Sequence, residues 1–290
     1  MSLEIPTSTK KAGTTMKTES QAQGTSYLLR PEGRIGYDVG GVGPHIVLVP
    51  GMGDLRAAYR FLAPELRAAG YRVASTDLRG HGDSDTNFAS YGDVETASDI
   101  VALIEELGGP AIVVGNSMGA GAAAFAAAER PELISALVLV GPFVRNGETT
   151  SIQKLLLRIA MAQPWAALSW NGYLPKLYKG TLPVDFSDYR KDVVKSLRRP
   201  GYAKSFSLTT RTDHTPTEHR LSEIKVPTLV VMGEKDPDFP DPRGEAEWIS
   251  QTLNAKVVMV PDSGHYPQSQ QPKITTSAVL SFLKELSRDA

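Results

Sequence analysis

The stretch from Ala111 to Ala128, which reads AIVVGNSMGAGAAAFAAA, contains a short β-branched run followed by a run of small residues. The first run is typical of a buried strand, and the alanine-rich run, which ends before Pro131, is typical of a helix. Between them lies the pattern G-x-S-x-G, with Ser117 at its centre. A turn this tight brings backbone segments together, so side chains at Gly115 and Gly119 would clash. The stretch predicts a sharp strand-to-helix turn that raises Ser117 above a parallel sheet.

Length and composition limit the possible function classes. At 290 residues the chain is long enough for one large domain, or for a core domain with an insertion. Its 31 Lys and Arg nearly balance its 32 Asp and Glu, which gives no support for binding to nucleic acid or to an anionic membrane surface. Because the chain has no cysteine, a disulfide framework, a thiol nucleophile and a cysteine zinc site are excluded.

The N-terminal segment and the hydropathy pattern bear on location. Residues 1–24 are polar and lack the apolar core of a secretory signal, so we expect a disordered leader. No apolar run approaches the roughly 20 residues that span a bilayer. We therefore expect a cytoplasmic protein without a membrane span, as a monomer or a homodimer.

Strand and helix patterns alternate over two parts of the chain. An antiparallel hairpin is expected over residues 26–39, with turn residues at 31–33. Further strands are expected at 45–49, 71–75, 111–114, 137–140, 227–232 and 256–260. Helices are expected at 55–69, 94–107, 120–128, 243–253 and 275–286.

The alternation stops between about residues 142 and 219. This segment contains amphipathic helical pieces, scattered prolines and several aromatic residues. We interpret it as a helical insertion above the active edge of a core formed by residues 25–141 and 220–290. Trp165, Trp170 and Tyr173 could line a pocket there, although aromatic residues at such spacing more often form the core of the insertion.

A serine hydroxyl is a poor nucleophile unless a base removes its proton and a carboxylate orients that base. Asp236 and His265 each follow an apolar run that predicts a parallel strand. Because the carboxyl ends of parallel strands meet at one edge of a sheet, we expect these side chains to lie near Ser117. The chain order Ser, Asp, His is the one expected for a hydrolase with this turn.

Several motifs together resemble the α/β-hydrolase superfamily over residues 26–288. They are PGMG at 50–53, DLRGHGDS at 77–84, GNSMG at 115–119, GEKD at 233–236 and SGH at 263–265. The resemblance implies an α/β fold with an eight-stranded, mostly parallel sheet flanked by helices. It also implies a helical cap inserted after the sixth strand.

The resemblance also implies a role for each site residue. Ser117 would be the nucleophile, His265 the general base and Asp236 its orienting acid. The backbone N–H groups of Met52 and Met118 would form an oxyanion hole. No cofactor and no metal is implied. Many members have His-Gly before the oxyanion residue where this chain has Pro-Gly at 50–51, which leaves the shape of that loop open.

The acid and histidine assignments have rivals. Asp238 and Asp241 closely follow Asp236, and we favour Asp236 because its offset from the strand matches the family pattern. His81 lies in a loop that is usually structural in this family, with Asp77 and Arg79 holding the loop by hydrogen bonds. His214 and His219 have no recognised metal-ligand spacing, so we expect them in a solvated connection between cap and core.

Three functions follow, the first of which we favour. It is hydrolysis of an ester or lactone of a small to medium apolar substrate through an acyl-enzyme on Ser117. The second is carbon–carbon bond hydrolysis of ring-cleavage products, because the GNSMG turn looks like the turn of that subfamily. The third is a ligand receptor on a hydrolase scaffold. Haloalkane dehalogenases and epoxide hydrolases of this fold use a carboxylate at the turn, so Ser117 argues against both.

Overall fold

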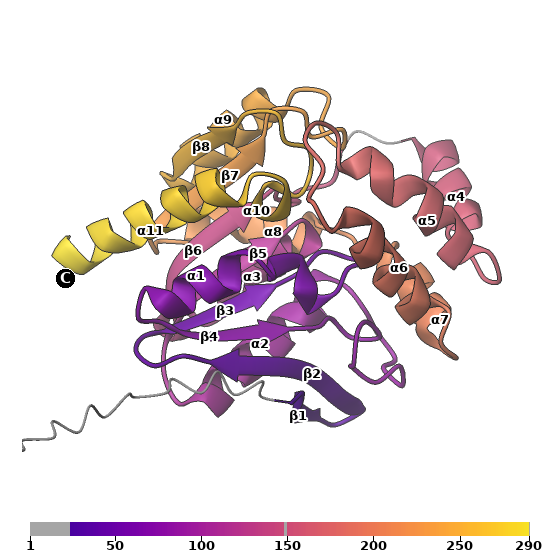
Figure 1. Ribbon diagram of the computed structural model, residues 1–290, viewed down its shortest axis with the longest axis horizontal. Helices are drawn as coiled ribbons and strands as arrows, with labels where there is room; N and C mark the ends of the chain where they lie inside the picture. Colours follow the sequence, from indigo (N-terminus) through magenta and orange to yellow (C-terminus); the bar gives the residue numbers. More distant parts are fainter. Residues whose placement is uncertain (1–23, 148–149, 290) are drawn as a thin grey trace, which may run out of the picture.

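The computed structural model describes residues 24–147 and 150–289 (Figure 1). Its strands are β1 (Ser26–Arg30), β2 (Gly33–Gly40), β3 (His45–Val49), β4 (Arg72–Thr76), β5 (Ala111–Asn116), β6 (Ile134–Val140), β7 (Thr228–Gly233) and β8 (Lys256–Val260). Its α-helices are α1 (Leu62–Ala68), α2 (Asp93–Leu107), α3 (Met118–Glu129), α4 (Ser151–Ala160), α5 (Ala166–Leu177), α6 (Phe186–Leu197), α7 (Tyr202–Thr209), α8 (Thr215–Arg220), α9 (Pro242–Leu253), α10 (Pro267–Gln270) and α11 (Pro272–Asp289). Short 3-10 helices are η1 (Arg56–Tyr59), η2 (Pro131–Leu133) and η3 (Leu221–Glu223).

All eight strands form one sheet in the order β1-β2-β4-β3-β5-β6-β7-β8. β2 pairs antiparallel with both β1 and β4, and the pairs from β4 to β8 are parallel. The prediction of an eight-stranded, mostly parallel sheet is therefore confirmed, including the N-terminal hairpin.

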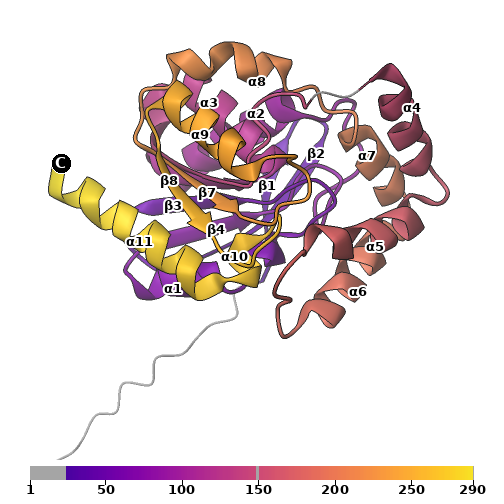
Figure 2. The same ribbon diagram turned by 90° about the horizontal axis from the view of Figure 1, so that it is seen from above.

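Helices cover both faces of the sheet, as Figure 2 shows from above. One apolar cluster joins the sheet to α2, α3 and α9, and a second joins it to α1 and α11. All six residues of β5 are buried, because the strand lies in the middle of the sheet with helices on both sides. This burial explains why the central strands read as continuous apolar runs rather than as alternating ones.

Among the described residues, five α-helices lie between β6 and β7, where the sequence predicts an insertion. α4 to α7 gather to one side of the sheet in both views (Figures 1 and 2). α8 instead packs against α3. The exact extent of the cap, residues 142–219, stays a prediction, and the predicted leader, residues 1–24, lies almost entirely outside the described residues. Within the described residues, no helix combines the length and hydropathy that crossing a membrane requires.

The single helix predicted over residues 55–69 is wrong, because the structure has η1 and α1 there instead. Pro64 explains the interruption. A proline inside one continuous helix would remove a backbone hydrogen bond and clash with the preceding turn. In the structure it is the third residue of α1, where the lost N–H has no intrahelical partner in any case.

The turn at Ser117 depends on two glycines. A Cβ at Gly115 would lie 2.3 Å from the Gly119 carbonyl oxygen, and one at Gly119 would lie 2.4 Å from the Pro50 carbonyl oxygen. Both contacts are with backbone atoms, which cannot move aside independently of the strands. The glycines therefore permit the close approach of β3, β5 and α3 below Ser117.

We predict that Gly119→Ala lowers the free energy of unfolding by about 1–3 kcal/mol, because the added methyl group overpacks this contact. Gly172→Ala in α5 is the matched control. A Cβ there meets nothing within 4 Å, so the control is expected to be neutral or stabilising by up to about 1 kcal/mol. Urea unfolding of both variants measures the difference, and equal effects would contradict the prediction.

Candidate active site

Ser117 lies between the last residue of β5 and the first residue of α3 and has a φ of 57°. Few residues other than glycine adopt a positive φ, so surrounding contacts must hold this conformation. The Ser117 N–H donates to the Val140 carbonyl at 2.9 Å, and the Phe143 N–H donates to the Ser117 carbonyl at 3.3 Å. These bonds to the end of β6 and the loop after it hold the serine at the N-terminus of α3, where positive helix-dipole charge favours a nearby anion.

Asp236 and His265 lie on the loops that follow β7 and β8. His265 Nδ1 and Asp236 Oδ2 are 2.8 Å apart, and both side chains are buried. A Cβ at Gly141 would lie 3.2 Å from each of these two atoms, so a glycine there leaves room for the pair. The His265 N–H donates to the Leu177 carbonyl at 2.8 Å, which connects the histidine loop to α5.

The protonation of His265 reflects opposing effects. Burial lowers its pKa, but the charge of Asp236 and the hydrogen bond to it, with further contributions from Asp238 and Asp54, raise the pKa to about 9. The imidazolium form is therefore stabilised here, which suits a group that must hold a proton during a reaction.

His265 Nε2 faces a second carboxylate. Asp238 Oδ2 lies 3.8 Å from this nitrogen. Among the described residues no hydrogen bond joins the Ser117 hydroxyl to His265. Such bonds between a nucleophile and its base are often long in structures without substrate and shorten in the reacting complex.

The loop after β3, residues 50–54, passes next to Ser117. A Cβ at Gly51 would lie 2.9 Å from the Ser117 Cβ. Neither the Met52 N–H nor the Met118 N–H has a hydrogen-bond acceptor within the described part of the chain. The first N–H groups of a helix such as α3 have no intrahelical partner. Both donors are therefore available to a ligand.

Contacts from three sides hold this loop. The Gly53 N–H donates to His81 Nε2 at 2.9 Å, and Trp170 Nε1–H of α5 donates to the Gly53 carbonyl at 2.8 Å. The Tyr189 hydroxyl of α6 donates to the buried carboxyl of Asp54. Burial raises the pKa of Asp54 to about 6, although the Tyr189 hydrogen bond opposes this shift. Cap helices and a core loop together determine the loop's shape.

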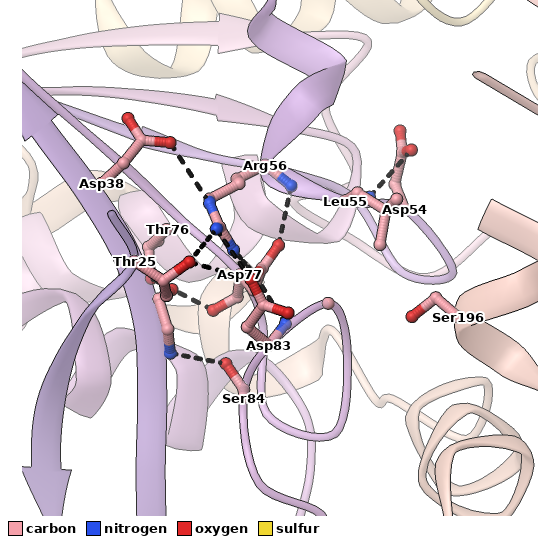
Figure 3. Close-up of polar contacts among 12 residues, drawn as sticks. Thr25, Asp38, Asp54, Leu55, Arg56, Thr76, Asp77, Asp83, Ser84 and Ser196 are labelled. Carbon is pink, nitrogen blue, oxygen red and sulfur yellow. Dashed lines mark hydrogen bonds and ion pairs between the residues drawn. The ribbon is translucent and has the colours of Figure 1, made fainter. Parts of the chain in front are cut away.

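The chain immediately after the loop is held by a charged network (Figure 3). The Arg56 N–H donates to Asp77 Oδ1 at 2.8 Å, and the guanidinium group also pairs with Asp77. The same side chain bonds Asp38 Oδ2 at 3.2 Å and Asp83 Oδ2 at 2.8 Å. A cavity of about 550 Å³ borders this network, but Ser117 is not among its lining residues.

Another cavity, of about 470 Å³, does reach Ser117. Its apolar wall consists of Met52, Met118, Phe143 and Leu157. Its polar wall contains Asn146, Arg158 and residues 209–215. The cavity therefore offers an apolar region beside the serine and a polar rim further away.

His214 lines this cavity, and its side chain is only 13% exposed, so the expectation of a solvated position is wrong for His214. His219 is exposed, as expected. The Nδ1 atom of His214 lies 2.8 Å from Asp93 Oδ2, and the Asp93 side chain is fully buried. The His214 ring stacks on Phe143 with centroids 5.7 Å apart. The Phe143 ring also stacks on Phe239 at 5.0 Å and meets the His265 ring edge-on at 5.8 Å. No local sequence signal pairs residues 93 and 214, which only the fold brings together.

One group among the described residues has the spacing of a cation site. Ligand atoms of Asp236, Asp238 and His265 lie within 4.8 Å of one another. Because His265 Nδ1 is already hydrogen-bonded to Asp236, a cation would have to compete with that bond. The same three side chains also form a hydrogen-bonded acid–histidine pair with a second acid beside it.

The structure places the predicted residues in two groups and separates some alternatives. Ser117, Met52 and Met118 share one cavity, and Asp236 contacts His265. Asp241 instead caps α9 by accepting from the Gly244 N–H at 3.0 Å. Trp170 is buried and Trp165 is exposed. Neither of them lines the cavity, and nor does Tyr173, although the sequence suggested all three as possible pocket residues.

His81 is a neutral structural residue, as expected. Its Nε2 accepts from Gly53, so the proton lies on Nδ1, which donates to the Arg79 carbonyl at 2.8 Å. Asp77 accepts from the Asp83 N–H at 2.9 Å. The prediction that Asp77 and Arg79 hold this loop is therefore confirmed. Burial lowers the pKa of His81 to about 4, although the hydrogen bond to Arg79 works in the opposite direction.

This shift predicts acid sensitivity. The unfolded chain binds a proton at His81 near pH 6.5 and the folded chain only near pH 4, so folding stability falls as the pH drops through this window. The loss attributable to His81 should reach about 3 kcal/mol. Urea unfolding at several pH values should show this loss of folding stability in the wild type and in a His45→Ala control. The loss should be absent from His81→Ala. A pH dependence that is identical in all three proteins would refute it.

Comparison with known proteins agrees with this geometry. A model of the alpha/beta hydrolase family matches residues 46–278. A pimeloyl-[acyl-carrier protein] methyl ester esterase of Neisseria meningitidis is 27% identical over 230 residues, covering 77% of this chain and 86% of that protein. A 2-hydroxy-6-oxononadienedioate/2-hydroxy-6-oxononatrienedioate hydrolase of Burkholderia vietnamiensis is 30% identical over 228 residues, covering 74% of this chain and 77% of that protein.

Solved structures show the same architecture. An esterase from Exiguobacterium antarcticum superposes with a TM-score of 0.78, covering 89% of this chain and 99% of the other at 21% identity. At this identity the likeness concerns the fold. The family match extends from β3 into α11 and includes the turn at Ser117 and the loops of Asp236 and His265. The chain therefore belongs to the alpha/beta hydrolase family.

Proposed function

We propose that this protein is a serine hydrolase that cleaves an ester or lactone of a small to medium, largely apolar substrate. The observation that carries the proposal is the 2.8 Å contact between His265 Nδ1 and Asp236 Oδ2, on loops adjacent to the turn that holds Ser117. A histidine oriented by a buried carboxylate is the base that a serine nucleophile requires.

In the proposed reaction, His265 Nε2 removes the proton of the Ser117 hydroxyl as Oγ attacks the substrate carbonyl. Asp236 keeps the remaining ring proton on Nδ1 and stabilises the imidazolium. The N–H groups of Met52 and Met118 donate to the oxyanion, and one such donor is worth roughly 3 kcal/mol of barrier. His265 then protonates the leaving alcohol. Finally it activates a water that hydrolyses the acyl-enzyme.

The cavity supports the proposed substrate class. A volume of about 470 Å³ suits a small to medium molecule, and the side chains of Met52, Met118, Phe143 and Leu157 provide an apolar wall. The relative from Neisseria, by its name a methyl ester esterase, is consistent with an ester substrate here.

A second candidate is carbon–carbon bond hydrolysis, which the 30% identity to the oxononadienedioate hydrolase favours. The same nucleophile and base would serve this reaction. A ligand receptor with slow or no turnover is the outcome that remains if neither bond type is cleaved.

The direct test uses p-nitrophenyl esters of increasing acyl length with wild type, Ser117→Ala and Asp236→Asn. We expect turnover by the wild type and a loss of more than about a thousandfold in kcat for Ser117→Ala. A fluorophosphonate should label wild type at Ser117, as mass spectrometry would show. Labelling without ester turnover would direct attention to lactones and diketones, whereas neither labelling nor turnover would refute the proposal.

The pH profile provides a further check. Because the pKa of His265 is raised to about 9, kcat/KM should rise through the alkaline range as the imidazolium loses its proton. A profile that is flat above pH 6.5 would contradict this assignment of the base.

The hydrogen bond from Trp170 to the oxyanion loop yields a separate prediction. Trp170→Phe keeps an aromatic ring against Phe206, whose centroid lies 5.0 Å away, but it leaves the Gly53 carbonyl without its donor. We expect kcat to fall roughly tenfold with little change in KM, because the loop would no longer be held in position. Trp165→Phe is the control, since its indole bonds the Ile159 carbonyl on the cap surface. Equal kcat values for the two variants would show that the Trp170 hydrogen bond does not position the loop for catalysis.

A further inference from the structure

Asp238 has a position that its sequence context does not suggest. It follows Asp236 by two residues, yet the two carboxylates contact opposite sides of the same imidazole. Asp236 Oδ2 is 2.8 Å from His265 Nδ1, and Asp238 Oδ2 is 3.8 Å from His265 Nε2. In the proposed reaction Nε2 is the atom that exchanges protons with Ser117 and with the leaving group. A second negative charge therefore lies at the reacting side of the base.

Two hydrogen bonds position Asp238, one through its carboxylate and one through its backbone N–H. The hydroxyl of Tyr173, from α5, donates to Asp238 Oδ1 at 2.8 Å. The Asp238 N–H donates to Asp236 Oδ1 at 3.1 Å. Because Tyr173 occupies Oδ1, the other oxygen is the one directed at His265. The side chain is 17% exposed, so it is partly desolvated but still reaches solvent.

The remaining charged groups near His265 do not cancel this charge. Asp236 and Asp54 are also acidic, and both raise the pKa of His265 as Asp238 does. Tyr173 is held neutral, since burial and the neighbouring Asp238 raise its pKa well above the ordinary value. The cavity's basic side chains Arg158 and Arg211 are solvent-exposed members of its polar wall.

We propose that Asp238 determines the charge selectivity of this site, favouring substrates whose leaving group is neutral or cationic over those whose leaving group is anionic. The inference rests on the proposed serine-hydrolase function. Its physical basis is that the leaving group must approach Nε2 to receive its proton, and this approach brings it close to Asp238. In a partly desolvated site a like charge at this range is repelled strongly and an opposite charge is attracted.

The charge of Asp238 also has a consequence for pH. Burial raises the pKa of Asp238, and the nearby Asp236 carboxylate raises it further, although the imidazolium of His265 opposes both effects. Protonation at acidic pH removes the negative charge. Selectivity against anionic leaving groups should therefore weaken as the pH falls.

Three acetate esters that differ in leaving-group charge test the proposal. They are 3-(trimethylammonio)phenyl acetate, its neutral isostere 3-tert-butylphenyl acetate, and 3-carboxyphenyl acetate, which is anionic. For the wild type we expect kcat/KM to decrease in that order. In Asp238→Asn the ratio of cationic to anionic ester should fall about tenfold or more, and Asp238→Glu should largely retain the wild-type order.

The matched control is Glu234→Gln, which removes one negative charge from the same loop at an exposed position paired with Arg243. It should leave the ratio unchanged. An NMR titration of the His265 ring provides a readout independent of turnover. Its pKa should fall by about one unit or more in Asp238→Asn and stay unchanged in Glu234→Gln.

The outcomes are distinguishable. A wild type that hydrolyses none of the esters and is not labelled at Ser117 overturns the proposed function and this inference with it. An active enzyme whose ester ratio is the same in wild type and in folded Asp238→Asn overturns this inference alone. Near-ultraviolet circular dichroism establishes that each variant is folded. If Asp238→Asn does not fold, Tyr173→Phe replaces it. This variant removes the hydrogen bond that holds the Asp238 carboxylate and should reduce the ratio of cationic to anionic ester hydrolysis.

Discussion

The backbone conformation of Ser117 is the constraint on which the rest of the site depends. A positive φ at a residue other than glycine is costly unless surrounding contacts hold it. The bond from the Ser117 N–H to the end of β6, and the close packing of Gly115 and Gly119 against neighbouring backbone, provide those contacts. The same packing explains why the central strands have apolar residues and why α3 consists mostly of alanine and glycine. It also orients the N-terminus of α3 toward the place where a reacting oxygen would gain charge.

Helices α5 and α6, from the segment inserted between β6 and β7, contact the candidate site directly. In α5, Trp170 donates to the Gly53 carbonyl in the loop after β3, and Tyr173 donates to Asp238. The Leu177 carbonyl of the same helix accepts from the His265 backbone N–H. α6 adds the bond from Tyr189 to Asp54. A shift of these helices would therefore move the loop donors and the base together. A few hydrogen bonds therefore connect the helices inserted after β6 to both halves of the candidate site.

Much of the fold could be predicted because its signals are local. Apolar runs of strand length, turn glycines and the small-residue helix after Ser117 each determine structure over a few residues, and the sheet prediction is confirmed. The prediction of one helix over residues 55–69 was wrong because it relied on the apolar spacing and neglected Pro64, which is tolerated only in the first turn of the shorter helix α1. At the site, the motif positions correctly indicated that Asp236 would meet His265. The order of the two neighbouring acids could not show that Asp238 would reach the opposite ring nitrogen, because that depends on the turn of the loop and on Tyr173.

The sequence by itself determined the fold class, the strand-to-helix turn at Ser117 and the loops that supply the polar side chains. These features follow from steric limits and burial patterns that act between near neighbours. Only the tertiary structure decided which side chains meet across long separations. Examples are Trp170 with Gly53, His214 with Asp93, and Tyr173 with Asp238. Those contacts depend on how the cap packs on the sheet, and the geometry of that packing is a property of the whole chain rather than of any one segment.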